Sequence, residues 1–169
     1  TVRSGEADVV LAGGCERMTN LSTADVTEGL ATAADDLYEI RAGITFPSAY
    51  ALMARAYFER FGGSREDLAH VAMKNHDNAL PNEYAQFHRE ITVEEALDAP
   101  MVADPLGLLD ACPVTDGASA VVFVSDEYAA ANDLEAPVSV TGSGQGGDNL
   151  ALQAREHLAV TPATERAAN

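Results

Sequence analysis

The sequence predicts a mixed α/β protein, because strand-like apolar runs lie near both ends of the chain and helical patterns lie between them. The run Asp8–Gly14 is apolar up to its two glycines and predicts a buried strand that ends in a tight turn. The continuous apolar run within Leu108–Val124 predicts a second strand that is buried on both faces. These two runs and the helical patterns between them carry the fold-class prediction.

The sequence that follows the first predicted strand predicts helices with recognisable ends. Residues Leu21–Arg41 are rich in acidic side chains and indicate a solvated loop or an irregular helix. Pro47–Phe61 has apolar residues at the spacing of one helix face, and two glycines follow it. A further helix is expected to begin at Ser64, with Asp67 at the capping-box position. Its predicted inner face consists of Leu68, Val71, Ala72, Asn75 and Ala79.

The later elements are shorter. Thr92 and Glu95 have capping-box spacing, and they predict a short helix that ends before Pro100. Residues Asp126–Asn132 predict another brief helix. Residues Pro137–Thr141 alternate between apolar and polar side chains, which predicts an additional strand.

A glycine-rich stretch and a last helix complete the pattern. The stretch Gly142–Gly147 lacks the Lys-Ser/Thr ending of a phosphate-binding P-loop, so it is interpreted as a strand-to-helix connection. Helical sequence follows, with Pro162 near its start.

The charge of the chain is strongly negative. Its 27 acidic and 10 basic residues give a net charge of −17, and Lys74 is the one lysine among 169 residues. Such a charge repels phosphate backbones and anionic headgroups, which argues against binding to nucleic acid or to a membrane surface. We expect a halophilic, cytoplasmic protein, because high salt screens this repulsion; an acidic protein of ordinary surroundings is the alternative.

Two cysteines are the candidate nucleophiles. Cys15 and Cys112 show no metal-ligand or redox-motif spacing, so we expect free thiols in a reducing compartment and no metal site. Either thiol could act with a histidine base in a cysteine-dependent hydrolase. Alternatively, both are small buried packing residues. The candidate bases are His70, His76, His88 and His157.

Three segments together resemble the thiolase family, specifically the sterol-carrier-protein type and the archaeal acetyl-CoA acetyltransferases. They are SGEADVVLAGGCERMT at Ser4–Thr19, VAMKNHDNALPNEYAQFHREITVEEAL at Val71–Leu97 and PMVADPLGLLDACPVTDGASAVVFV at Pro100–Val124. The similarity continues into Pro137–Leu152. The resemblance therefore covers most of the chain in order.

The resemblance implies an incomplete αβαβα layered fold with an inserted, mainly helical loop domain. Residues 1–17 would be the end of the first thiolase half before the insertion, and residues 18–105 would be the loop domain. Residues 106–134 would be the last strand and helix of the first half. Residues 135–169 would begin the second half.

The resemblance also implies a chemistry. Thiolases join or split acyl-CoA thioesters by Claisen condensation or thiolysis through an acyl-cysteine. The family's nucleophilic cysteine precedes the part that resembles Ser4–Gly14, and its His and Cys motifs follow the part matched here. We therefore expect no catalytic residue among these residues, and an inactive internal portion of an acyltransferase. Coenzyme A thioester would be the substrate, with no bound cofactor.

Binding positions and partners follow from the same resemblance. Cys112 and Pro113 fall in a family loop that lies along the pantetheine of CoA, and Phe46–Tyr50 resembles the pantetheine loop, which makes Phe46 and Tyr50 candidates too. A full-length relative would be a homo-oligomer. It could associate with hydroxymethylglutaryl-CoA synthase and a small zinc-ribbon bridging protein. A non-catalytic module that binds CoA or a partner is the alternative function.

Overall fold

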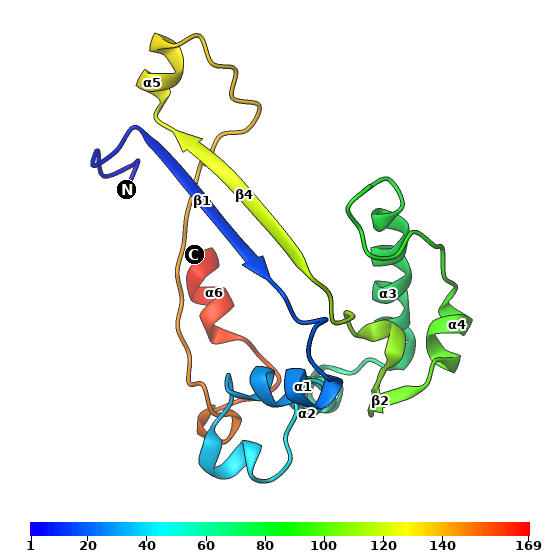
Figure 1. Ribbon diagram of the computed structural model, residues 1–169. Helices are drawn as coiled ribbons and strands as arrows, with labels where there is room; N and C mark the ends of the chain where they lie inside the picture. Colours follow the sequence, from blue (N-terminus) through cyan, green and yellow to red (C-terminus); the bar gives the residue numbers. More distant parts are fainter. The chain divides into compact units, whose positions relative to one another are not determined.

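The computed structural model describes residues 1–169 and confirms the mixed α/β class (Figure 1). The chain divides into two compact units. The first consists of Thr1–Asn20 and Val114–Ser143, and the second of Leu21–Pro113 and Gly144–Asn169. Each unit is described by itself.

The first unit is built on an antiparallel strand pair. β1 (Val9–Glu16) pairs with β4 (Gly117–Val124), so that Val9 lies opposite Val124 and Glu16 lies opposite Gly117 (Figure 1). Ser125 follows β4, donates its N–H to the carbonyl of Asp8 over 2.8 Å, and caps α5 (Asp126–Ala131). The predicted brief helix at this position is confirmed.

Four expectations for this unit are wrong. β1 continues through its two glycines instead of turning there, and β4 begins at Gly117, well after Leu108. Both strands are mainly exposed, with Leu11 71% and Val122 59% exposed, because each strand has one partner and no further element of this unit packs on the pair. Residues 137–141 form no strand, since they have no pairing partner. An apolar pattern predicts that a segment forms a strand. It does not show which residues, if any, pack on the two faces of that strand.

The second unit begins with three helical elements. They are α1 (Thr23–Ala31), the π-helix η1 (Asp36–Ile40) and α2 (Phe46–Phe61). The side chains of Ser22, Asp35 and Thr45 cap their N-termini by accepting main-chain N–H groups. The acidic stretch before α2 is thus more regular than a solvated loop, and the predicted helix after it is confirmed.

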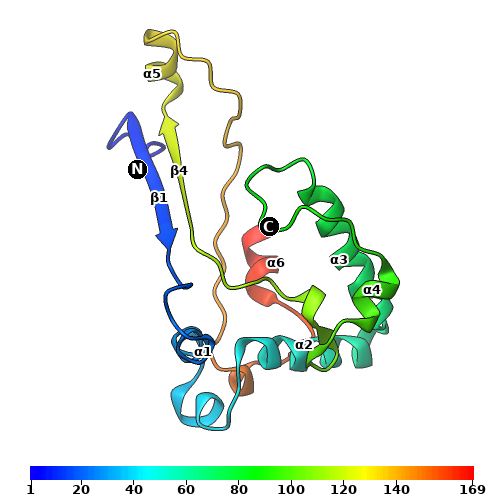
Figure 2. The same cartoon turned by 45° about the vertical axis from the view of Figure 1, so that its right-hand side comes forward.

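The main core of this unit lies between two capped helices. α3 (Arg65–Ala79) and α4 (Val93–Asp98) both begin with the predicted capping boxes, at Ser64 and at Thr92. Figures 1 and 2 show α4 beside α3. The buried residues of this core are Ala69, Ala72, Ile91 and Ala96.

The inner face of α3 differs from the predicted one. Val71 is 51% exposed and Asn75 is also exposed. The face that packs against α4 instead centres on Ala69 and Ala72, with Met73 packed beside them. Both stripes fit a helical period, and only the position of α4 decides between them.

A small hairpin and the end of the chain complete the second unit. β2 (Met101–Ala103) pairs with β3 (Leu106–Gly107), and the 3-10 helix η2 (Leu108–Asp110) follows. Arg55 of α2 forms an ion pair with Asp104 in the hairpin turn. The last elements are the 3-10 helix η3 (Leu152–Ala154) and α6 (Pro162–Ala168), which confirms the helix expected near Pro162. None of the helices has the length and apolar character needed to cross a membrane.

Candidate functional site

A pocket of about 300 Å³ lies within the second unit. α2 and η1 form one side of it, and the segment around η3 together with the start of α6 forms the other. Most of its lining is apolar or small. The lining residues are Ala31, Ala33, Ala34, Glu39, Ile44, Thr45, Phe46, Ala49, Tyr50, Met53, Asp148, Leu150, Leu152, Arg155, Thr161, Ala163 and Thr164.

The first turns of α2 place two aromatic rings in this pocket. Thr45 caps the helix and Pro47 occupies its first turn, which fixes the helix start just before the rings. Phe46 and Tyr50 are four residues apart, so they lie on one face, and their ring centroids are 6.2 Å apart. Both rings keep access to the surface, at 36% and 57% exposed. Two of the candidate binding residues are therefore brought together here.

The other two candidates lie elsewhere. Cys112 and Pro113 are exposed in the irregular segment between η2 and β4, and neither lines the pocket. Cys15 lies in β1 and is exposed as well. The interpretation of both thiols as buried packing residues is wrong, because one lies on an uncovered strand pair and the other in a segment without regular structure.

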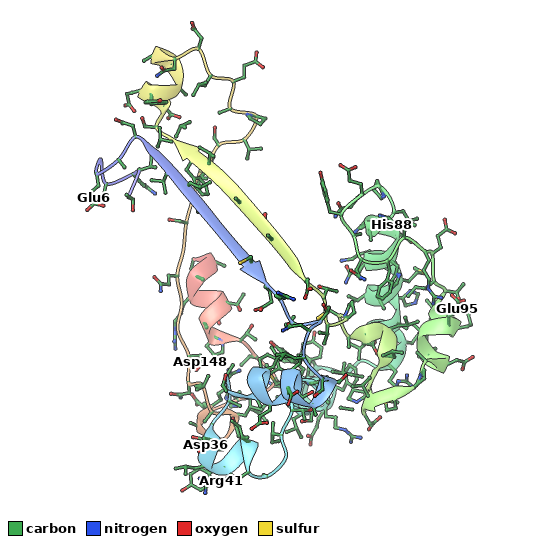
Figure 3. The ribbon with its side chains drawn as sticks, viewed as in Figure 1. Glu6, Asp36, Arg41, His88, Glu95 and Asp148 are labelled. Atoms are coloured by element: carbon green, nitrogen blue, oxygen red, sulfur yellow. The ribbon has the colours of Figure 1, made fainter.

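Two of the four candidate histidines hydrogen-bond main-chain carbonyls, and no hydrogen bond joins a histidine to a thiol. The Nδ1 atom of His76 lies 3.1 Å from the carbonyl oxygen of Arg89, and the side chain of His88, labelled in Figure 3, hydrogen-bonds the carbonyl of Asn82. Neither cysteine hydrogen-bonds to a histidine. No group of three or more His, Cys, Asp or Glu side chains is arranged to hold a metal ion.

Glu39 is the buried charged residue of the pocket, at 5% exposed. Its carboxylate accepts the N–H of Leu152 through Oε1 and the N–H of Asp35 through Oε2, the latter over 2.8 Å. Sequence reasoning missed this residue. It lies in an acidic stretch beside Asp36, whose side chain is exposed and pairs with Arg41 over 3.7 Å (Figure 3), and no local pattern separates the two carboxylates.

Two further charged residues lie at the pocket. Asp148 and Arg155 both belong to the segment around η3, and Figure 3 labels Asp148. Arg155 donates its Nε–H to the carbonyl of Asn149 over 3.0 Å. An apolar lining with a few polar groups suits a flexible chain that carries amides, because such a chain needs apolar contact along its length and a few hydrogen bonds.

Asp116 organises the first unit near the start of β4. Its carboxylate accepts the N–H groups of Met18 and Thr19 and the hydroxyl of Thr19. These hydrogen bonds, the main-chain N–H of Thr19 first, lower the pKa of Asp116 from its ordinary value.

The chain is similar to known proteins along almost its whole length. Residues 1–127 match the family described as "Thiolase, N-terminal domain". The chain is 43% identical over 167 residues to the acetyl-CoA acetyltransferase of Methanothermobacter thermautotrophicus, which covers 99% of this chain and 43% of that protein. It is 38% identical over 161 residues to the acetyl-CoA acetyltransferase of Methanocaldococcus jannaschii, covering 93% of this chain and 40% of that protein.

A solved structure is also similar. The chain superposes on the Ltp2-ChsH2(DUF35) aldolase with a TM-score of 0.76 and 28% sequence identity, covering 96% of this chain and 43% of that one. The chain therefore spans about two fifths of the length of the relatives that it matches.

Proposed function

Because this chain belongs to the thiolase family, we propose that it forms part of an acyl-CoA acyltransferase of the acetyl-CoA C-acetyltransferase type. The expected fold, a part of the thiolase-like α/β arrangement, is confirmed by the family match and the structural neighbour. One observation carries the proposal: 43% identity to an acetyl-CoA acetyltransferase over 99% of the chain. The substrate is an acyl-CoA thioester, and no separate cofactor takes part.

In this proposal the pocket beside α2 receives the acyl-pantetheine arm of the thioester. The apolar lining and the exposed edges of Phe46 and Tyr50 support this position, since the arm alternates methylene groups with amides. Cys112 and Pro113 flank the CoA from their exposed segment. The domain boundaries follow the thiolase plan, at residues 17/18, 105/106 and 134/135.

A binding measurement with two matched tyrosine variants tests the assignment of the pocket. Tyr50 and Tyr57 both lie on α2 and are 57% and 50% exposed, but Tyr57 packs in a tilted arrangement against Phe61, with ring centroids 5.0 Å apart, and does not line the pocket. Calorimetry with acetoacetyl-CoA in molar KCl should show about tenfold weaker binding for Tyr50→Ala, because a large side chain loses its apolar contact. Tyr57→Ala should bind like the wild type. Equal effects of the two variants would contradict the assignment.

We also propose that the 169 residues alone do not turn over substrate, with the acyl-accepting cysteine lying outside them. The exposed thiols without histidine partners support this statement. An assay of acetoacetyl-CoA thiolysis should show no activity above background. Activity that Cys112→Ala abolishes would overturn it and would favour Cys112 as a nucleophile.

A non-catalytic CoA-binding module is the second candidate. It is favoured by the composition of the pocket lining: all of the lining residues belong to the second unit, and none of them is a cysteine. The DNA that adjoins the coding region separates the two candidates. If it encodes the cysteine-bearing helix and the His and Cys motifs of thiolases in frame, the acyltransferase proposal holds.

The surroundings and partners are proposed on the same basis. The net charge of −17 with one lysine supports a halophilic, cytoplasmic protein. Its thermal midpoint should then rise steadily from 0.1 to 3 M KCl. A homo-oligomer and an association with hydroxymethylglutaryl-CoA synthase and a zinc-ribbon protein are proposed for the full-length enzyme. Size measurement and co-purification in high salt test these associations.

A further inference from the structure

The buried carboxylate of Glu39 joins two distant parts of the chain. Its Oε1 accepts the N–H of Leu152, which is 113 positions away, while its Oε2 accepts the N–H of Asp35. A carboxylate that is 5% exposed is strongly disfavoured unless hydrogen bonds replace its water. The burial of the Glu39 carboxylate therefore depends on both hydrogen bonds, the one from Asp35 and the one from Leu152.

The backbone holds Glu39 firmly in this position. Its N–H donates to the carbonyl of Asp35 over 3.1 Å, and its carbonyl accepts the N–H of Ile44 over 3.0 Å. The side chain of Asp35 accepts the N–H of Tyr38 over 2.7 Å and caps the element. A π-helix such as η1 is rare and frequently occurs at functional sites. These main-chain hydrogen bonds and the cap fix the backbone from which the Glu39 carboxylate extends.

Leu152, the remote partner of Glu39, belongs to a segment that we call the wall segment, Asp148–Arg155. Four residues of this segment line the pocket. This segment is hydrogen-bonded within itself. The amide of Asn149 donates to the carbonyl of Ala154 over 2.8 Å, and Arg155 donates to Asn149 through Nε over 3.0 Å. Its main chain closes the 3-10 turn from Arg155 N–H to the carbonyl of Leu152 over 3.1 Å. The segment is therefore held together by its own hydrogen bonds, and the contact between Leu152 and Glu39 is the hydrogen bond that joins it to η1.

We infer that Glu39 is a positioning residue that holds the wall segment in place through the Leu152 N–H and thereby sets the affinity of the pocket for an acyl-CoA thioester. The part about affinity rests on the proposed function. When the hydrogen bond is lost, the wall segment should occupy the position seen here in a smaller fraction of the molecules, and the apparent dissociation constant should rise by the factor by which that fraction falls.

Leu152→Pro removes the donor side of this contact selectively. Leu152 opens η3, so its N–H has no partner within the helix, and proline is favoured at such a first position. Ala151 has φ −68° and ψ 128°, the extended conformation that a residue before proline adopts. Leu152→Ala is the matched control, because it shortens the side chain and keeps the N–H. On the acceptor side, Glu39→Met keeps the length of the side chain and removes both acceptor oxygens, and Asp36→Asn, which removes the charge of the exposed neighbour, is its control.

The test measures acetoacetyl-CoA affinity and amide hydrogen exchange on the full 169-residue chain. We expect Glu39→Met and Leu152→Pro each to weaken binding at least tenfold more than their controls, and the double variant to bind no more weakly than either single one. Exchange at Leu152 should rise at least tenfold in Glu39→Met, while exchange at Ala72 in the core stays unchanged.

The possible failures are distinguishable. Unchanged exchange at Leu152 in Glu39→Met overturns the inference, whether or not the chain binds acetoacetyl-CoA. Additive losses of affinity in the double variant also overturn it, because the two changes would then act on different contacts. If the wild type binds no thioester but Glu39→Met still raises exchange at Leu152 alone, the proposed function fails while the positioning role of Glu39 stands.

Discussion

Thr19 donates both its main-chain N–H and its hydroxyl to the carboxylate of Asp116, over 2.9 and 2.7 Å. β1 ends at Glu16 and β4 begins at Gly117, and these two residues lie opposite each other in the strand pair. The contact between Thr19 and Asp116 therefore closes the end of the pair at which β1 leaves and β4 enters. It joins residues that are 97 positions apart.

This contact predicts a loss of stability in acid. The hydrogen bonds lower the pKa of Asp116 in the folded protein, whereas the unfolded chain has an ordinary value of about 3.9. The stabilisation is therefore fully present above about pH 5 and is lost as the pH falls through 3.9 toward the folded pKa. Urea unfolding between pH 6 and pH 3 at constant ionic strength should show this loss.

Two variants assign the effect to Asp116. Asp116→Asn should lower stability at pH 6 and flatten the acid dependence, because an amide does not titrate. Thr19→Val keeps the branched shape and removes the hydroxyl, so the pKa of Asp116 should rise toward its ordinary value. A profile in Asp116→Asn parallel to that of the wild type would show that other carboxylates cause the acid loss.

Elements with local determinants could be predicted from the sequence. The capping boxes at Ser64 and Thr92 use residues three positions apart, so a short stretch of sequence contains all of their partners. The exposed strands and the rotated face of α3 could not be predicted in the same way. Whether Val71 or Ala69 is buried depends on where α4 lies, and exposure of Leu11 depends on a covering layer.

The candidate site shows the same division. Phe46 and Tyr50 share a helix face by their spacing, and they do lie together in the pocket. Glu39 could not be predicted, because its partner Leu152 is remote and its neighbours are equally acidic. The exposure of Cys112 likewise depends on the irregular course of residues 111–116.

The core between α3 and α4 gives a prediction for stability. Ile91 is 4% exposed and packs with Ala69, Ala72 and Ala96, so Ile91→Ala should cost about 2–5 kcal/mol in the free energy of unfolding. Val71→Ala is the control on α3, since Val71 is 51% exposed and should change stability by less than about 0.5 kcal/mol. A large loss in Val71→Ala would mean that the inner face first expected for α3 is the buried one.

Arg65 gives a second prediction for this region. Its guanidinium donates to the carbonyl of Leu97 over 3.1 Å and to that of Pro105 over 3.2 Å, which joins α3 to the end of α4 and to the hairpin turn. Arg65→Met keeps the apolar stem but leaves both carbonyls without this donor, so unfolding should require about 1–3 kcal/mol less. Arg60→Met, at an exposed position over the Phe61 ring, is the control and should cost about 0.5–1 kcal/mol. Equal losses would show that the two hydrogen bonds contribute little.

The glycines before η3 pack against the main chain of α6, and they give the last prediction. A Cβ at Gly146 would overlap the carbonyl oxygen of Ala163, and one at Gly144 would overlap that of Ala167, whereas a Cβ at Gly147 meets nothing. Gly147 also accepts a hydrogen bond from Arg166 of α6 over 2.7 Å, so the two segments lie in contact along the helix. Gly146→Ala should therefore cost about 1–3 kcal/mol, as overpacking does.

Hydrogen exchange locates this effect. In Gly146→Ala the amides of α6 should exchange faster, because the glycine segment must move away from the helix, while those of α3 keep their protection. Gly147→Ala is the control and should leave α6 unchanged, since its Cβ enters open space. Faster exchange in both variants would mean that glycine flexibility matters here and the close approach does not. Faster exchange in Gly146→Ala alone would show that the missing side chain lets this segment lie against α6.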